Sequence, residues 1–547
     1  MVTSEASRPG RPDAALPPRR PRRWAAAAAW TCAGGAFYAL QLQAVTGVRL
    51  DSDGANSALQ AWDMFHGNPL LHGWIFGDAT YYTLELPLIG IAQLIFGLGV
   101  RSAHLASATT FFLVVAFAVS LAVAGGRGLA QAARAGVTVA VLTVPLLTMA
   151  MLITLMAEPD HAGTSAFLLA SALVIECRPG WKLAAPLLCL ILAAGQLGDA
   201  TVLYIVLPAI VVICGYRQLA AFLPQRKASG RFRAVLRSPD AAILAGAIAS
   251  VPLEMAIRAL MRLLGGYEMV APRVKLAPPS LWPRQLAITW MNIRTLFATV
   301  PESHTPLGAV VPALGWLCLA AAVAGAGRVA WTWRRASRAE QVLAVAIVFN
   351  IAIYAVSTMV NIVNYRELAA VLPCSAVLAA RALVPGQVRA PVRAIAAAAV
   401  AVAVALVPLS ATATRPYAGA ATGPAPLDGD GEVPLAPVIA WCEEHGISYA
   451  LSDYFISSAT TVGSAGQVSV RATGQGHGIP AWEDDTRWYD PARYDIRYVV
   501  TQDYHEVWYL AALGRPAAVY HISRGWMVLK YTMNLLPKLT PPNHPAS

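Results

Sequence analysis

The sequence has little charge. Of its 547 residues, 13% are Asp, Glu, Lys or Arg and 57% are hydrophobic, and the mean hydropathy is +0.53. Because a typical soluble domain carries about 25% charged residues, this composition excludes an ordinary soluble enzyme and indicates a polytopic membrane protein. The net charge of +11 comes from short basic clusters between apolar runs, as in cytoplasmic loops, so it does not indicate nucleic-acid binding.

Several chemical signatures are missing from the sequence. The seven cysteines form neither a CxxC pair nor a zinc-ligand spacing, so they predict no disulfide framework and no metal cluster. A P-loop, a G-x-S-x-G motif, an H-E-x-x-H motif and a dinucleotide fingerprint are absent as well. Nothing therefore supports ATP-driven transport, serine hydrolysis or zincin chemistry.

Long apolar runs alternate with short polar loops. The basic segment "RRPRRW" predicts a cytoplasmic tail over 1–23, followed by a retained first span over 24–47. The run 81–99 contains Glu85 and Pro87, and if it spanned the membrane the basic segment "GGRGLAQAARAG" would lie outside. We therefore predict an outer juxtamembrane or re-entrant helix there. Ten further spans are predicted at 102–124, 135–156, 163–177, 183–198, 200–215, 241–263, 308–326, 341–360, 367–384 and 393–412.

The pattern changes after the last span. A stretch rich in Gly, Pro and Ala over 413–433 predicts a linker. Beyond it, "PLAPVIAWCEEHG" has the pattern of an amphipathic helix, "ISYALSD", "YDIRYVVTQD" and "AAVYHISRGWMVLKYT" have that of strands, and the Gly-rich "GSAGQVSVRATGQGHG" is predicted as a loop. We predict an all-α polytopic membrane domain over 24–412, with about eleven transmembrane helices, followed by a small extracytoplasmic α/β domain over 434–547.

Acidic residues gather where the first span reaches its predicted outer end. The stretch "VRLDSDGANSALQAWDMFHGNPLLHGW" contains Asp51 and Asp53. A carboxylate at a membrane surface can deprotonate a hydroxyl or hold a divalent cation. The alternative is a helix cap, because Asp is favoured where a helix begins. Asp63 in the same stretch is predicted to lie on a helix face with no special role.

Two further polar turns lie at predicted outer ends. In "AEPDHAGT", Glu158, Asp160 and His161 could ligate a metal or contact a phosphate, since charges so close to hydrocarbon are costly without a role. The alternative is a polar turn between two helices. Asp199 in "GQLGDAT" could form another acidic wall or could end a hairpin. If a divalent cation such as Mg or Mn is bound, Asp51, Glu158 and Asp160 are its predicted ligands.

Basic residues also occur at the outer face. In "NIVNYRE", Arg366 departs from the positive-inside trend, and a guanidinium suits bidentate phosphate binding. It could instead pair with Glu367 or extend toward lipid headgroups. The loop 264–307 mixes aromatic residues with basic ones, among them Lys275, Arg294 and His304. This mixture is typical of a headgroup belt and also suits a pocket for lipid-linked phosphate.

The layout resembles the polytopic GT-C glycosyltransferases, which include protein O-mannosyltransferases and aminoarabinose transferases. Their first outer loop is similar to "DGANSALQAWDMFHG", with Asp53 in the first acidic place and Ala61, Met64 and Gly67 in step. "LELPLIGIAQLIFGLGVRSAHLAS" resembles their juxtamembrane helix, "AEPDHAGT" occupies the place of their second acidic motif, and "NYRELAAVLPCSAVLAAR" is similar to a late "RY..P..P" element. The resemblance covers about 24–385.

Two positions depart from the family pattern. Gly54 stands where the second acid of the first motif is expected, and Arg366 follows Tyr365 where the order is often reversed. The resemblance implies that Asp53 is the base of an inverting transfer from a polyprenyl-phosphate sugar. It implies acceptor- or cation-positioning roles for Asp51, Glu158, Asp160, His161 and Asp199. Binding of the lipid phosphate would fall to Arg366, Tyr365, Arg294, His304 and Lys275.

The resemblance also implies partners and a location. The expected partners are a polyprenyl-phosphate-linked sugar, membrane lipid and a glycan, lipid or protein acceptor, in a bacterial cytoplasmic membrane with the C-terminal domain outside. Two alternatives stay open. A secondary transporter or flippase would also be polytopic, although transporters place polar features near the bilayer midplane. An inactive relative that scaffolds envelope assembly is the other.

Overall fold

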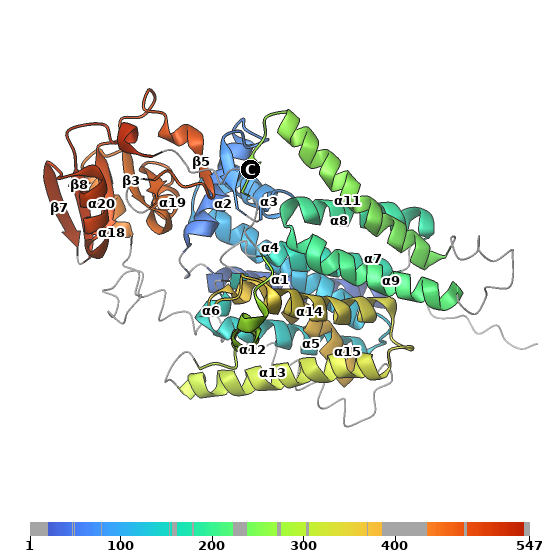
Figure 1. Ribbon diagram of the computed structural model, residues 1–547. Helices are drawn as coiled ribbons and strands as arrows, with labels where there is room; N and C mark the ends of the chain where they lie inside the picture. The colour runs from blue at the N-terminus through green and yellow to red at the C-terminus, as the bar shows by residue number, and fades with distance from the viewer. Residues whose placement is uncertain are drawn as a thin grey trace, which may run out of the picture.

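The structure is a computed structural model. It describes residues 20–45, 48, 50–77, 79–152, 154–155, 161–177, 180–222, 238–270, 275–301, 306–368, 370–384, 435–474, 478–523 and 525–540. A helical bundle is joined to a smaller domain built on a β-sheet, which confirms the predicted fold class (Figure 1). The predicted linker 413–433 and the predicted last span 393–412 lie outside the described residues.

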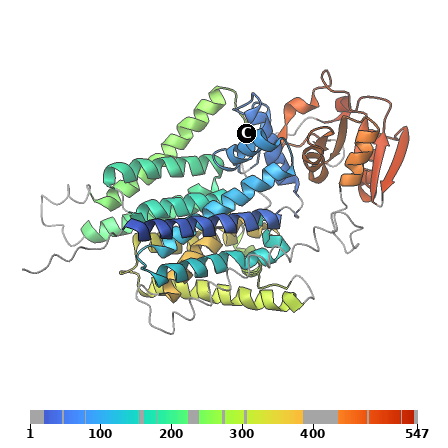
Figure 2. The same ribbon diagram turned by 180° about the vertical axis from the view of Figure 1, so that it is seen from behind.

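Long helices lie side by side in the bundle (Figures 1 and 2). They are α1 (Arg20–Val45), α4 (Val100–Val123), α5 (Leu129–Thr143), α7 (Ala162–Cys177), α8 (Trp181–Gly198), α9 (Leu207–Phe222), α11 (Pro239–Leu263), α13 (Pro306–Trp331), α14 (Arg338–Val356) and α15 (Val371–Leu383). Each overlaps a predicted span, although α5 and α9 overlap theirs only in part. Six helical segments in the described part of the chain are long and apolar enough to cross a membrane, and shorter apolar helices accompany them. The predicted total of eleven stays a prediction.

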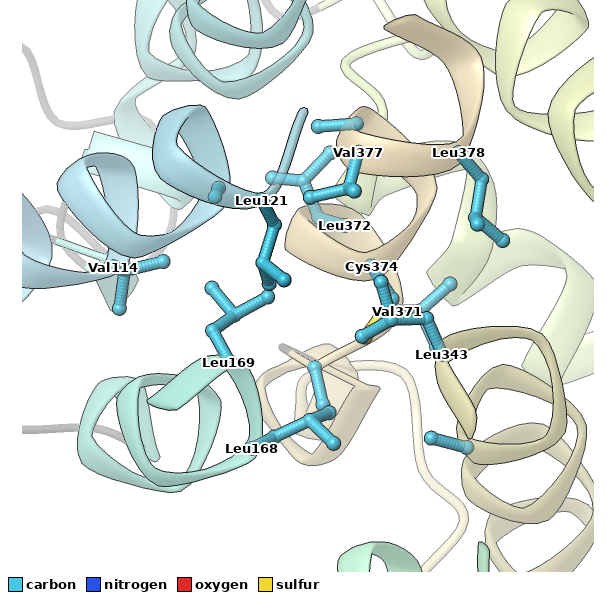
Figure 3. Close-up of a cluster of buried hydrophobic side chains, with 14 of the residues drawn as sticks. Val114, Leu121, Leu168, Leu169, Leu343, Val371, Leu372, Cys374, Val377 and Leu378 are labelled. Atoms are coloured by element: carbon cyan, nitrogen blue, oxygen red, sulfur yellow. The ribbon is translucent and has the colours of Figure 1, made fainter. Parts of the chain in front are cut away.

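The core of the bundle surrounds α15. Figure 3 shows Val371 and Leu372 of this helix among side chains that include Leu168 from α7 and Leu343 from α14. Every residue from Val371 to Arg381 is buried, so α15 is covered on all sides. A helix in that position has to be apolar almost all round, which is why its sequence shows no polar face.

Shorter elements cover one end of the bundle. They are α2 (Ser52–Phe65), β1 (Trp74–Phe76), α3 (Glu85–Phe96), η1 (Pro145–Leu147), α6 (Met149–Leu152), the π-helix η3 (Val202–Val206), β2 (Glu268–Met269), η5 (Pro279–Leu281), α12 (Trp282–Leu296) and η6 (Asn364–Leu368). Helix α3 has 12 residues and is therefore about 18 Å long, whereas a bilayer core is about 30 Å thick. Its exposed Leu94 and Ile95 suit the juxtamembrane position predicted for this run.

The C-terminal domain contains a five-stranded mixed sheet in the order β4-β3-β6-β8-β7. Its elements are α18 (Ala436–Glu444), β3 (Tyr449–Asp453), α19 (Tyr454–Gly463), β4 (Ser469–Thr473), β5 (Asp484–Asp485), η7 (Thr486–Tyr489), β6 (Tyr498–Gln502), η8 (Asp503–His505), α20 (Glu506–Leu513), β7 (Ala518–Ser523), β8 (Trp526–Lys530) and η9 (Leu536–Lys538). Strand β3 runs parallel to β4 and β6, and β8 runs antiparallel to β6 and β7.

One sequence prediction for this domain is wrong. The stretch "GSAGQVSVRATGQGHG" is not a loop throughout, because it contains β4, whose register pairs Val470 with Ala450 of β3. Four of the five residues of β4 are buried. A strand covered on both faces lacks the alternation that marks a half-exposed strand, and the flanking glycines hid the short β-branched run.

The C-terminal domain is joined to the first loop by a second, smaller sheet in the order β2-β1-β5 (Figure 1). Asp63 fastens this junction, because its Oδ2 accepts hydrogen bonds from Trp74 Nε1 at 2.8 Å and from Arg487 Nη2 at 2.5 Å. Arg487 also pairs with Asp485 of β5. The prediction that Asp63 has no special role is therefore wrong: it ties the soluble domain to the membrane domain.

The opposite end of the bundle holds a network of ion pairs. Arg381 at the end of α15 donates to Glu176 Oε1 at 2.9 Å and to the Leu121 carbonyl at 2.6 Å. Arg338 at the start of α14 binds Asp240 through two hydrogen bonds of 2.5 and 3.0 Å. These residues come from segments next to the basic loops that the sequence predicts to be cytoplasmic.

Candidate functional site

Asp53 lies in the first turn of α2 and is held by two groups from distant parts of the chain. Its Oδ2 accepts a hydrogen bond from Arg366 Nη1 at 3.1 Å, and its Oδ1 accepts one from the Tyr454 phenol at 2.8 Å. The Asp53 and Arg366 side chains are 30% and 35% exposed. A carboxylate beside a guanidinium is therefore open to solvent at the end of the bundle where the two domains meet.

Asp51 is the N-cap of α2. Its Oδ1 accepts a hydrogen bond from the backbone N–H of Gly54 at 2.8 Å, which is the capping alternative raised by the sequence. A Cβ atom at position 54 would lie 2.6 Å from Leu50 Cδ1 and 3.3 Å from Asp51 Oδ1. The departure from the family pattern at Gly54 thus has a steric reason in this chain.

The soluble domain contributes Tyr454, which the sequence reasoning missed. This residue begins α19 directly after β3, and its hydroxyl lies 3.0 Å from Glu483 Oε2 as well as 2.8 Å from Asp53. Burial, followed by the charges of Glu483 and Asp53, holds the pKa of Tyr454 well above its usual range, so the phenol keeps its proton. Neither Tyr454 nor Glu483 stands in a recognisable motif, and about 400 residues separate them from Asp53.

The short turn η6 places two charged side chains on different partners. Arg366 contacts Asp53, whereas Glu367 Oε1 lies 3.4 Å from His161 Nε2. His161 Nδ1 lies 2.7 Å from Asp199 Oδ2, so the buried imidazole lies between two carboxylates. The structure therefore joins four predicted site residues, Asp53, Arg366, His161 and Asp199, through one turn.

Asp199 is held in place by its surroundings. It is the C-cap of α8, its Oδ1 accepts from the backbone N–H of Thr201 at 2.8 Å, and its Oδ2 accepts from the Thr164 hydroxyl. Next to this group, a Cβ at Gly163 would overlap the carboxylate of Glu85, which is 4% exposed. The small residue at 163 is therefore what lets the acidic end of α3 pack against α7.

The remaining predicted residues lie elsewhere or outside the described part of the chain. Arg294 of α12 stacks over the Trp316 ring at 5.7 Å, the backbone of Lys275 bonds Thr358, and Tyr365 packs against the hydrophobic core. Their roles in binding a lipid phosphate stay predictions. Glu158, Asp160 and His304 lie outside the described residues.

Of the three predicted metal ligands, Asp51 lies in the described part of the chain, whereas Glu158 and Asp160 lie outside it. Within the described residues, no group of three or more His, Cys, Asp or Glu side chains is arranged to hold a metal ion. Asp51 caps a helix, and both oxygens of Asp53 accept hydrogen bonds from protein groups. Asp51 and Asp53 are therefore engaged by protein groups, and the metal site stays a prediction.

A cavity of about 270 Å³ opens beside Glu367. Its walls come from the end of α8, the π-helix η3, the last turns of α14 and η6, and they include Asp199, Tyr204, Asn350, Tyr354 and Glu367. A π-helix is rare and is frequently found at functional sites. The cavity lies next to the Asp53–Arg366 pair, because Glu367 lines the cavity and Arg366, the residue before it in η6, contacts Asp53.

Comparisons with known proteins agree with this architecture. The structure is similar to that of ArnT from Cupriavidus metallidurans in the apo state, with a TM-score of 0.54 and 14% sequence identity over 94% of this chain and 100% of that chain. ArnT bound to undecaprenyl phosphate gives a TM-score of 0.49 at 15% identity over 94% of this chain and 99% of that chain. The Archaeoglobus fulgidus oligosaccharyltransferase tethered to an acceptor peptide gives 0.45 at 15% identity over 86% and 69%. No protein-family model and no curated protein sequence matches the chain.

The first of these likenesses shows the fold. ArnT is an aminoarabinose transferase of the GT-C superfamily. This chain accordingly has the GT-C fold, as the layout of its sequence predicts. At 14% identity the likeness fixes the arrangement of the helices, and the chemistry has to be argued from the site itself.

Proposed function

We propose that this protein is a membrane glycosyltransferase that moves a sugar from a polyprenyl-phosphate donor to an acceptor hydroxyl. The observation that carries the proposal is the contact of 3.1 Å between Asp53 and Arg366 at one end of a GT-C bundle. The transfer needs a base for the acceptor and a cation for the leaving phosphate. Asp53 can serve as the base and Arg366 as the cation, and the two side chains are in contact.

The proposed reaction is a single displacement with inversion. The acceptor hydroxyl gives its proton to the Asp53 carboxylate while its oxygen attacks the anomeric carbon. The bond between that carbon and the phosphate oxygen breaks, and the electron pair leaves with the polyprenyl phosphate. Asp53 is suited to this role because its side chain is 30% exposed, so an acceptor can reach it.

Arg366 is proposed to stabilise the phosphate as negative charge develops on it. Its guanidinium has five N–H donors, and Nη1 donates a hydrogen bond to Asp53. A planar guanidinium suits the oxygens of a phosphate, which it can bind in a bidentate manner. Because a lipid phosphate is already a good leaving group, this stabilisation of charge is the main demand on the protein.

The proposed reaction takes place on the outer face of a bacterial cytoplasmic membrane. Asp53 follows α1, which begins within the basic segment "RRPRRW". Since clusters of Lys and Arg stay on the cytoplasmic side, the opposite end of α1 and the soluble domain packed on α2 lie outside. Polyprenyl-phosphate sugars and a glycan, lipid or protein acceptor would meet there.

The experiment is a transfer assay with the purified protein in lipid nanodiscs. Radiolabelled polyprenyl-phosphate donors that carry a hexose, a pentose or an amino sugar are supplied in turn, and release of polyprenyl phosphate is measured. We expect release with at least one donor and a loss of about 10²–10⁴-fold in Asp53→Asn, because removing a general base costs that much. Asp503→Asn is the matched control, since Asp503 is exposed on the soluble domain.

Two results would contradict the proposal. Release that survives Asp53→Asn would remove Asp53 from the role of base. Absence of release with every donor would favour a transporter, a flippase or an inactive scaffold instead.

A further inference from the structure

The cavity beside Glu367 has a polar wall with an unused hydrogen-bond acceptor. Asn350 is 3% exposed, and its Nδ2 donates to the Glu367 carbonyl at 2.8 Å. Its Oδ1 has no hydrogen-bond partner among the described residues. A buried acceptor without a partner costs about 1–3 kcal/mol, so a donor supplied by a ligand would stabilise it.

The charged residues at this wall are acidic. Asp199 and Glu367 line the cavity, and the described lining contains no Lys or Arg. His161 lies behind them and contacts both carboxylates, so a protonated imidazole balances one of the two charges. The cavity therefore keeps at least one net negative charge. It repels a phosphate and attracts hydroxyl or ammonium hydrogens.

The other walls are apolar and aromatic. Ile205 and Tyr204 come from the π-helix, and Ile353 and Met359 lie opposite in the lining. Apolar walls with a few convergent polar groups are typical of pockets that hold a small organic molecule. The ring carbons of a sugar suit such walls, and its hydroxyls suit the acceptors of Asn350 and Glu367.

We propose that this cavity binds a sugar ring through its hydroxyl or amino hydrogens, while any phosphate attached to the sugar stays outside, toward Arg366. The identity of the ligand as a sugar rests on the proposed function. The exclusion of phosphate rests on the cavity alone. Two consecutive residues of η6 separate the phosphate from the sugar ring: Arg366 contacts Asp53, whereas Glu367 lines the cavity.

The test measures binding without turnover. Saturation-transfer NMR is recorded on the full-length protein in lipid nanodiscs, which avoid sugar detergents, with methyl mannoside and glucosamine as probes and inorganic phosphate as competitor. We expect transfer to methyl mannoside, to glucosamine or to both, and a tenfold excess of inorganic phosphate should not reduce it. Transfer to glucosamine alone assigns the amino group as the recognised donor, and transfer to both neutral and amino sugars assigns the hydroxyls.

Two variants locate the binding. Asn350→Leu removes the unused acceptor and should raise the dissociation constant about fivefold, the effect of one hydrogen bond. Ala200→Leu places extra carbon atoms in the cavity wall and should weaken binding as well. The matched control is Gln93→Leu, because Gln93 is also buried, also donates to a backbone carbonyl and also has an unpartnered side-chain oxygen among the described residues, but it does not line the cavity.

The outcomes separate this proposal from the one on function. Binding that is lost equally in Gln93→Leu, or that is unchanged in both Asn350→Leu and Ala200→Leu, overturns the cavity proposal. Displacement of the sugars by inorganic phosphate overturns it too. Sugar binding that passes these tests in a protein without transferase activity upholds the cavity and leaves the proposed reaction refuted.

Discussion

The two ends of the bundle both contain networks of charged side chains, but the networks differ in completeness. At the predicted inner end, Arg381 is 6% exposed and meets Glu176, the Leu121 carbonyl and the Ser337 hydroxyl. At the outer end, Asn350 has an oxygen without a partner among the described residues, and it lines a cavity. A network whose polar groups all have hydrogen-bond partners holds helices together. A network that leaves an acceptor without a partner beside a cavity is suited to bind a ligand.

The two ends also differ in charge balance. At the inner end each buried acid of the described network faces an arginine, as Asp240 faces Arg338 and Glu340 faces Arg328. At the outer end Arg366 is matched with Asp53, while Glu367 and Asp199 share His161. The excess of acid at the outer end is costly for folding, and its position beside a cavity is the physical argument for a role in binding.

The largest expected effect is on stability at the inner end. Arg381→Met leaves Glu176 without its buried partner, and breaking a buried ion pair costs about 3–5 kcal/mol. The free energy of unfolding, measured by denaturant titration in mixed micelles, should fall by that amount. Arg328→Met is the control, because the Arg328 side chain is 40% exposed and its loss should cost about 1 kcal/mol or less. Equal losses of unfolding free energy in the two variants would contradict the view that the buried Arg381 network holds the inner end together.

The next effect is on activity at the outer end. Arg366→Met should lower the rate of sugar transfer about 10²–10³-fold, as does removal of a donor to developing negative charge elsewhere. The free energy of unfolding should change by about 1 kcal/mol or less, because the Asp53–Arg366 pair is about one-third exposed. If the free energy of unfolding fell by several kcal/mol together with the transfer rate, Arg366 would be a residue that stabilises the fold, as Arg381 is.

A smaller effect is expected where the two domains meet. Asp63→Ala removes the acceptor of the Trp74 indole and of Arg487, and a buried donor left unpaired costs about 1–3 kcal/mol. The docked domain should open more often, so hydrogen exchange of α19 and β5 should accelerate. Asp490→Ala is the control, since Asp490 lies on the exposed surface of the same domain in a pair with Arg493. Unchanged exchange in Asp63→Ala would show that strand pairing alone holds the domain.

The last effect concerns pH and an acid that forms no ion pair within the described residues. Burial raises the pKa of Asp484 from 3.8 to about 8, and Tyr489 donates a hydrogen bond to it. Because the folded-state pKa is raised, the neutral form stabilises the domain fully below about pH 4, and this stability is lost as the pH rises through about 8. Thermal unfolding between these values should show that loss in the wild type, with a flatter curve in Asp484→Asn. Parallel curves for the two proteins would contradict the assignment.

Much of the architecture could be predicted because local patterns determine it. Runs of apolar residues predicted the long helices, and the interruption at Glu85 predicted the short helix α3 at one end of the bundle. Asp53 and Arg366 were both singled out from the sequence, but as separate residues. Helix α12 was missed because its loop mixes aromatic and basic residues, and its apolar face is visible only against α14.

The sequence by itself determined the membrane bundle, the soluble domain and the gathering of acids at one set of helix ends, since hydrophobicity and charge act locally along the chain. Only the tertiary structure decided the role of each acidic residue. Asp51 became a cap, Asp63 a tie between domains and Asp53 the partner of Arg366 and Tyr454. These roles depend on residues hundreds of positions away, which pattern and spacing along one segment cannot bring together.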